Sequence, residues 1–137
     1  MGCGEDNICD ETLPSLDQYI AEQNITVTEG QEGLRYTIIE PGSAERPSGT
    51  ATVTVNYTGT LTNGLVFDET NPNGQQPIQF PLNRLIRGWQ LGIPLIGRGG
   101  RIELYIPSEI GYGNRQAGSI CPNSDLIFEI ELVNFVE

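Results

Sequence analysis

The residue types available for chemistry in this chain are limited by two absences. The 137-residue sequence contains no histidine, and its seven basic residues are all arginines, so lysine is missing as well. Serine–histidine and cysteine–histidine catalysis, a histidine-bound metal, a Schiff-base lysine and a Walker-type phosphate loop each require one of the missing residues. The composition therefore excludes these mechanisms, and we expect neither a metal nor a cofactor.

The charge of the chain is concentrated near its beginning. The net formal charge is −11, and residues 1–32 hold eight acidic residues and no basic one, whereas the remainder has ten acidic residues against seven arginines. A protein that binds nucleic acid needs a basic face to neutralise phosphates, so nucleic acid is excluded as a partner. We expect residues 1–12 to form an acidic, flexible tail.

Two stretches have apolar residues at helical spacing. In the first, residues 13–23, either Thr12 or Ser15 is placed to cap a short helix. In the second, residues 85–93, internal glycines and a following proline keep the helix short. We therefore expect an N-terminal helical extension over residues 13–30 and one short helix within the domain that follows.

The rest of the chain has the pattern of β-strands. Residues 50–60 alternate between apolar and polar side chains, which is typical of a half-buried strand. Asn63-Gly64 is a strong signal for a tight hairpin turn. Further extended segments lie at residues 34–39, 66–67, 78–82, 102–106 and 126–132.

These segments predict an α+β fold for residues 31–137. We expect four or five mostly antiparallel strands in a twisted sheet that closes around the short helix, because that arrangement buries all the apolar faces at once. No apolar run approaches the roughly 18 residues of a membrane-spanning helix. The sequence contains no internal repeat.

Five motifs follow one another along these segments: VNYTG at 55–59, GLVFD at 64–68, IRGW at 86–89, IP and GYG within 106–113, and LIFEIEL at 126–132. In order and spacing, they resemble the motifs of the FKBP-type peptidyl-prolyl cis–trans isomerases, from about Leu34 to Glu137. The resemblance implies an antiparallel half-barrel sheet wrapped around helix 85–93, with an apolar cleft between helix and sheet.

The resemblance also implies a set of site residues. Trp89 would form the floor of the cleft, and the backbone N–H of Ile86 and the hydroxyl of Tyr112 would donate hydrogen bonds to bound carbonyl groups. Asp68 follows an apolar pair, where an unpaired carboxylate is costly, so it is either paired with the Tyr57 hydroxyl or an ordinary turn residue. The implied catalytic residues are Tyr57, Phe67, Asp68, Ile86, Trp89, Tyr112 and Phe128, and the implied substrate-binding residues are Ile78, Leu85 and Ile120.

The activity implied is the cis–trans isomerisation of X–Pro bonds in unfolded or flexible polypeptides. The rotation faces a barrier of about 18–20 kcal/mol because the amide loses resonance as it twists. No covalent bond is made or broken, so neither a nucleophile nor a base is needed. An apolar pocket favours the twisted amide, and suitably placed donors add binding that exists only in the rotated state. Macrolide inhibitors are further candidate ligands.

Two other functions remain open from the sequence. One is a binding or chaperone module that holds proline-containing segments with little turnover, because Ile78 stands where many family members have an aromatic residue. The other is a tethered structural lipoprotein whose cleft is incidental. Trp89 and Phe128 would also suit an ordinary hydrophobic core.

The three cysteines bear on the location of the protein. Gly2-Cys3 followed by an acidic stretch resembles the start of a bacterial lipoprotein, so Cys3 is a candidate for lipidation and membrane tethering. Cys9 and Cys121 would then be left to pair as a disulfide in an oxidising compartment. This interpretation favours the bacterial cell envelope, with the protein lipid-anchored in the periplasm. The alternative is three free thiols in a cytoplasmic protein.

Overall fold

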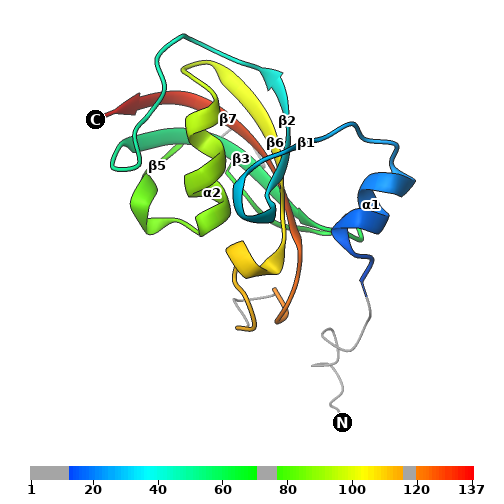
Figure 1. Cartoon of the computed structure of the whole chain (residues 1–137). Helices are drawn as coiled ribbons and strands as arrows, with labels where there is room; N and C mark the ends of the chain where they lie inside the picture. The colour runs from blue at the N-terminus through cyan, green and yellow to red at the C-terminus, as the bar shows by residue number, and fades with distance from the viewer. Residues whose placement is uncertain (1–12, 71–76, 116–119) are drawn as a thin grey trace.

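The computed structural model describes residues 13–70, 77–115 and 120–137, which form one antiparallel sheet with two α-helices (Figure 1). The strand order is β1-β2-β6-β7-β3-β4, and β5 also pairs with β3. Within the described ranges, no helix is long and apolar enough to cross a membrane. The elements are α1 (Leu16–Glu22), β1 (Thr28–Glu29), η2 (Gln31–Gly33), β2 (Arg35–Glu40), β3 (Thr52–Leu61), β4 (Val66–Glu69), β5 (Ile78–Pro81), η3 (Leu82–Arg84), α2 (Arg87–Gly92), η4 (Ile93–Leu95), β6 (Gly100–Ile106), η5 (Ser108–Ile110) and β7 (Leu126–Val136), where η marks a 3-10 helix.

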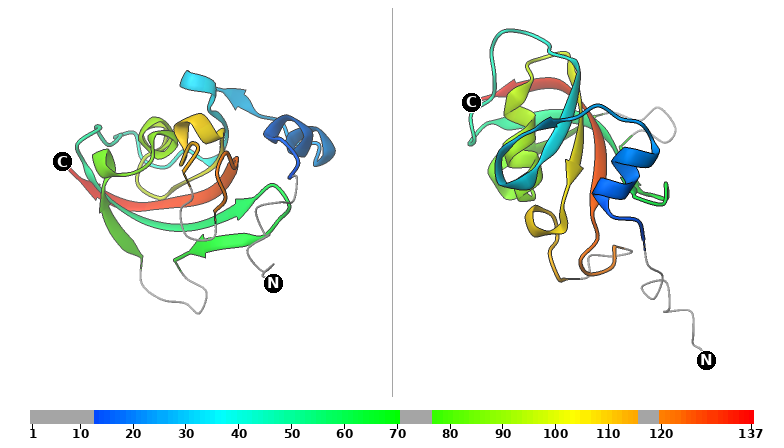
Figure 2. Two further views of the ribbon diagram at one scale, coloured as in Figure 1. Left: turned by 90° about the horizontal axis from the view of Figure 1, so that it is seen from below. Right: turned by 45° about the vertical axis from the view of Figure 1, so that its right-hand side comes forward.

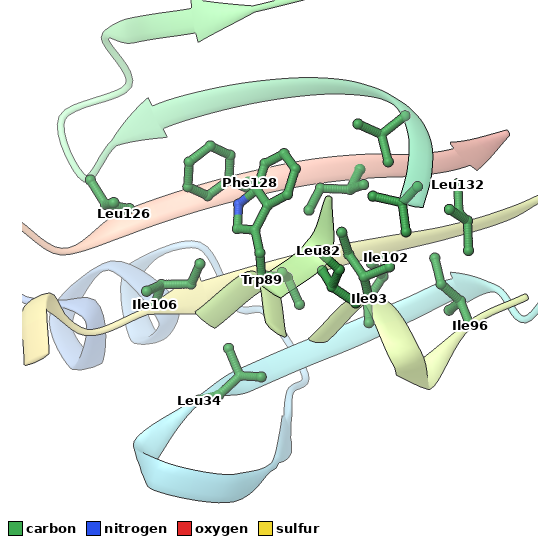
Figure 3. Packing of buried hydrophobic residues seen from close by; sticks show 14 of the residues in the cluster. Leu34, Leu82, Trp89, Ile93, Ile96, Ile102, Ile106, Leu126, Phe128 and Leu132 are labelled. Atoms are coloured by element: carbon green, nitrogen blue, oxygen red, sulfur yellow. The ribbon is translucent and has the colours of Figure 1, made fainter. Parts of the chain in front are cut away.

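The sheet curves around α2, which lies against its concave side (Figure 2). The alternation of β6 sets this arrangement, because Ile102, Leu104 and Ile106 point to one face and are fully buried there. Figure 3 shows Trp89 and Ile93 from the helical segment meeting side chains of the sheet in this core. The expected α+β architecture, a twisted sheet around one short helix, is confirmed.

Two glycines allow α2 to approach β6 closely. A Cβ atom on Gly88 would lie 2.6 Å from Cδ1 of Ile106, and one on Gly92 would lie 2.5 Å from Cδ2 of Leu104. Either contact is shorter than packed atoms tolerate, so a larger residue would push the helix off the sheet. The glycines therefore fix the height of Trp89 above the sheet.

The N-terminal extension packs on the opposite face of the sheet from α2. Tyr105 and Ile127 are cross-strand neighbours in β6 and β7, and their side chains form a second apolar cluster with Leu16 of α1. Because successive side chains of a strand point to opposite faces, Tyr105 faces α1 while Leu104 faces α2. The expected acidic tail over residues 1–12 lies outside the described residues.

Both helices begin later than the sequence pattern indicates. Ser15, and not Thr12, caps α1: its Oγ accepts a hydrogen bond from the N–H of Gln18 at 3.1 Å. The second helix begins at Arg87 because Ile86 is extended, with φ −60° and ψ 155°.

Over the described ranges the sheet has seven strands, whereas the sequence pattern indicates four or five. The shortest is β1, whose Thr28 and Glu29 pair with Tyr36 and Arg35 of β2. Two residues cannot display an alternating pattern, so only the pairing with β2 defines this strand.

Candidate active site

A cavity of about 260 Å³ opens between α2 and the concave face of the sheet. Residues far apart in the sequence meet there, since β3, β4, β5 and β7 supply the walls on one side, and η3, α2 and the loop after η5 supply the other. Most of the lining side chains are aromatic or aliphatic. The lining residues are Tyr57, Phe67, Asp68, Phe80, Arg84, Leu85, Ile86, Trp89, Tyr112 and Phe128.

Trp89 forms the centre of an aromatic cluster under this cavity. Its ring lies edge-to-face against Tyr57 (centroids 5.0 Å apart, 82° between planes), Phe128 (5.1 Å, 86°) and Phe80 (6.2 Å, 89°). Edge-to-face pairing of this kind adds to the stabilisation from burial alone. The Trp89 side chain is 4% exposed, and its Nε1 atom is buried with no hydrogen-bond partner among the described residues. In Figure 3 this nitrogen lies on the edge of the indole toward Phe128.

Gly59 allows two further rings to close one end of the cluster. A Cβ atom at this position would lie 2.7 Å from both Cε1 of Phe128 and Cζ of Phe67. Those two rings pack edge-to-face at 5.5 Å over the glycine. The backbone of β3 therefore leaves space that the side chains of β4 and β7 fill.

Tyr57 and Asp68 form a polar pair in the otherwise apolar wall. The Tyr57 hydroxyl donates a hydrogen bond to Oδ2 of Asp68 at 2.6 Å, which is the first of the two alternatives considered for Asp68. Gly59 of β3 pairs with Asp68 of β4, and this register brings the carboxylate alongside the hydroxyl. Burial, followed by the hydrogen bond and the charge of Asp68, raises the pKa of Tyr57 well above its ordinary value. The hydroxyl therefore stays protonated and donates its hydrogen bond to Asp68.

Two hydrogen-bond donors on the cavity wall have no acceptor within the described part of the chain. The amide N–H of Ile86 lies between the end of η3 and the first turn of α2 and makes no backbone or side-chain hydrogen bond. The hydroxyl of Tyr112, on the loop after η5, is also unpaired, and burial together with the charge of Asp68 raises its pKa. A half-buried donor without a partner is costly, so both are suited to a bound carbonyl.

The cavity does not include every residue expected from the sequence. Ile78 is 41% exposed and is absent from the lining, and Phe80, two residues further along the same face of β5, supplies the aromatic wall. Ile120 is 5% exposed and packs within the main core. Leu85 lies at the cavity as expected.

Two lining residues, Phe80 and Arg84, were not predicted as site residues. Phe80 could have been found from its alternation with Ile78 and Leu82 in the expected strand. Arg84 shows no periodic or motif signal, and only the turn of η3 brings it to the cavity.

The cysteine expectations rest largely on residues that the structure does not describe. Cys121 is disulfide-bonded. Cys3 and Cys9 both lie outside the described residues. The pairing of Cys9 with Cys121 and the lipidation of Cys3 therefore stay predictions.

The geometry defines a class of site: a mostly apolar, aromatic-lined cavity with two unpaired hydrogen-bond donors on the described part of its wall. Residues 43–133 match the family model described as FKBP-type peptidyl-prolyl cis-trans isomerase. The chain belongs to this family.

Individual relatives agree with the family match. The chain is 46% identical over 105 residues to a probable FKBP-type peptidyl-prolyl cis-trans isomerase of Haemophilus influenzae, covering 76% of this chain and 43% of that protein. It is 42% identical over 103 residues to the outer membrane protein MIP of Legionella longbeachae, covering 74% and 44%. The crystal structure of FkpA from Escherichia coli superposes with a TM-score of 0.80 at 38% identity, covering 88% of this chain and 57% of that one. The chain thus spans less than half the length of these two curated relatives.

Proposed function

We propose that this protein catalyses the cis–trans isomerisation of X–Pro bonds in unfolded or flexible polypeptides. The observation that carries the proposal is the pair of unpaired donors, the Ile86 N–H and the Tyr112 hydroxyl, on the wall of a cavity floored by Trp89. The family match supports the same activity.

The cavity suits the rotation of an amide for two physical reasons. The proline ring and the apolar residue before it would rest on the aromatic cluster, which replaces water around the bond. The twisted amide has less carbonyl charge separation than the planar one and is therefore less disfavoured in this environment. A donor that meets the carbonyl only after rotation binds the transition state more strongly than the substrate, and such differential binding accelerates the step.

Asp68 and Tyr57 have a supporting role in this proposal. Their hydrogen bond, 2.6 Å long, holds both side chains at the cavity wall. Burial and, after it, the charge of Asp68 raise the pKa of the Tyr112 phenol above its ordinary value. The Tyr112 hydroxyl, protonated at physiological pH like any ordinary phenol, is a donor there.

The proposal is tested with a neutral proline peptide whose isomerisation is followed directly. The Tyr112→Phe variant is expected to lower kcat/KM by about threefold to tenfold, as for the loss of one hydrogen bond in the transition state. Tyr36→Phe removes a hydroxyl from a tyrosine that packs on the core but does not line the cavity, and is expected to match the parent protein. No acceleration by the parent protein would overturn the proposal, and equal rates for the two variants would overturn the role of the Tyr112 hydroxyl in it.

The alternative function, a binding module with little turnover, is distinguished from the enzyme by measuring peptide affinity and isomerisation rate on one preparation. Tight peptide binding without acceleration would favour the module. Its main support in the sequence was the aliphatic Ile78, which lies outside the cavity lining, whereas Phe80 contributes an aromatic ring there. The same assay, with a macrolide such as tacrolimus added, tests the proposal that this cavity also binds macrolide inhibitors.

We propose a location in the bacterial cell envelope, with Cys3 as the lipid-bearing residue. The disulfide at Cys121 supports an oxidising compartment. One relative is named an outer membrane protein. Mass spectrometry of the protein from its native host tests the proposal: a diacylglyceryl mass on Cys3, lost in Cys3→Ser, is the expected result, and an unmodified Cys3 would exclude the tether. Unaltered catalysis by a variant lacking residues 1–30 would separate tethering from the isomerase function.

A further inference from the structure

Arg84 contributes the only cationic side chain among the cavity-lining residues that the structure describes. It is the last residue of η3 and precedes Leu85 and Ile86 directly. The side chain is exposed at the edge of the cavity, unlike the buried rings of the floor. This position puts a guanidinium at the solvent-exposed edge of the apolar cavity.

The charge of Arg84 is not neutralised by any ion pair within the described part of the chain. Four of the other six arginines form ion pairs: Arg35 with Asp17, Arg87 with Glu32, Arg98 with Glu45 and Arg101 with Glu129. Arg84 and Asp68 line the same cavity but form no salt bridge with each other. The guanidinium is therefore available to a carboxylate from outside the protein.

The two sides of the cavity differ in charge. On the β4 side, the carboxylate of Asp68 accepts the hydrogen bond of the Tyr57 hydroxyl. On the η3 side stands the unpaired guanidinium of Arg84. A peptide with an acidic side chain is attracted to the η3 side and repelled from the β4 side, which favours one orientation of the chain across the cavity.

In the proposed function, Arg84 would lie within reach of the residues that flank the proline. Its Cα atom is two residues from that of Ile86, hence at most about 7.6 Å away. An extended peptide advances roughly 3.3–3.6 Å per residue, so this offset corresponds to about two substrate residues from the carbonyl that would accept the hydrogen bond of the Ile86 N–H. Because the residue directly before the proline would enter the apolar cavity in the proposed function, the acidic side chain would belong one or two residues away from the X–Pro bond.

We infer that Arg84 is a specificity-determining residue, which selects substrates with a glutamate or aspartate close to the isomerised proline. The inference rests on the proposed isomerase function and adds a substrate class to it. The contact is exposed to solvent, so its contribution is moderate: we expect about a twofold to fivefold higher kcat/KM for a glutamate peptide than for its glutamine counterpart.

The test uses capped peptides that share a Leu-Pro bond and differ at one position, either two residues before the proline or one residue after it. That position carries Glu, Gln or Lys. With the parent protein, the glutamate peptide is expected to be preferred at one of the two positions. Arg84→Gln is expected to remove the preference, and Arg84→Glu to reverse it in favour of the lysine peptide. High salt should reduce the discrimination, because it screens exposed charges.

Arg46→Gln is the matched control. Arg46 is an exposed arginine away from the cavity, whose side chain donates to the carbonyl oxygens of Ser43 and Glu45. This variant changes the net charge by the same amount as Arg84→Gln and is expected to keep the glutamate preference. Loss of the glutamate preference in both variants would assign that preference to the electrostatic field of the whole protein and overturn the role of Arg84.

The outcomes distinguish this inference from the proposed function. Absence of acceleration with the glutamine peptide would contradict the isomerase activity itself. Normal acceleration with no difference among the Glu, Gln and Lys peptides, or a preference that persists in Arg84→Gln, would leave the enzyme intact and overturn the inference about Arg84.

Discussion

Leu16 and Asp125 are 109 positions apart in the sequence, and the amide N–H of Leu16 donates a hydrogen bond to Oδ2 of Asp125 at 3.1 Å. The other carboxylate oxygen, Oδ1, accepts from the N–H of Ser108 at 3.0 Å. Leu16 is the first residue of α1, and Ser108 begins η5, just before the loop that carries Tyr112. One side chain therefore joins the N-terminal extension to a segment of the cavity wall.

Removing this carboxylate is expected to destabilise the protein. Asp125→Ala leaves two half-buried amide donors without an acceptor, so the free energy of unfolding should fall by about 2 kcal/mol. Asp17→Ala is the control, since Asp17 is 82% exposed and, among the described residues, pairs only with Arg35, and it should cost less than about 1 kcal/mol. Denaturant titration measures both values, and equal losses would show that the bridging hydrogen bonds contribute nothing beyond an exposed ion pair.

The close contact of α2 with β6 predicts a strong effect of one added methyl group. In Gly92→Ala, the new Cβ meets Leu104, and we expect about 1–3 kcal/mol of destabilisation from overpacking. Gly49→Ala is the control, because a Cβ atom there meets nothing within 4 Å and the backbone φ is not positive. Thermal unfolding compares the two variants. A Gly92→Ala protein as stable as Gly49→Ala would mean that α2 can move away from the sheet at little cost.

Ile78 and Phe80 of β5 should differ in their effect on catalysis. Phe80 packs against Tyr57 and Trp89, with ring centroids 6.3 and 6.2 Å apart, whereas Ile78 does not line the cavity. Phe80→Leu is therefore expected to raise KM for a proline peptide severalfold, and Ile78→Val to leave KM unchanged. Steady-state isomerisation kinetics at equal folded concentration provide the measurement. The reverse order of effects would restore Ile78 as the substrate-binding residue.

The phenols of Tyr57 and Tyr105 predict how stability responds to alkaline pH. Burial, together with Asp68 for Tyr57 and Glu103 for Tyr105, raises both pKa values above the ordinary 10.0. A phenol that ionises less readily in the folded state contributes stability that is complete below pH 10 and is lost as the pH rises above it, because only the unfolded chain then releases the proton.

We therefore expect the free energy of unfolding to decline above about pH 10. Tyr57→Phe and Tyr105→Phe should each make the decline shallower, since each removes one of the linked protons. Urea unfolding over a pH series gives the slope of the free energy of unfolding against pH for each protein. A slope unchanged in both variants would assign the alkaline loss of stability to other groups.

The sequence by itself determined the local strands and turns. Its lack of histidine and lysine also excluded the mechanisms that need those side chains. The alternation in residues 50–60 and 102–106 and the Asn63-Gly64 turn, with Gly64 at φ +89°, predicted strands and a hairpin that the structure contains. These features depend on neighbouring residues, so a local pattern records them. The motifs also predicted most of the cavity wall, because family resemblance carries long-range information that periodicity lacks.

Only the tertiary structure decided which side chains meet. The Tyr57–Asp68 hydrogen bond depends on the register of β3 against β4, and the position of Phe80 in place of Ile78 depends on how β5 lies over α2. Arg84 reaches the cavity through the turn of η3, and α1 is held by a residue 109 positions away. Such contacts join segments whose separation along the chain leaves no periodic trace, and the free energy of packing the whole domain selects among them.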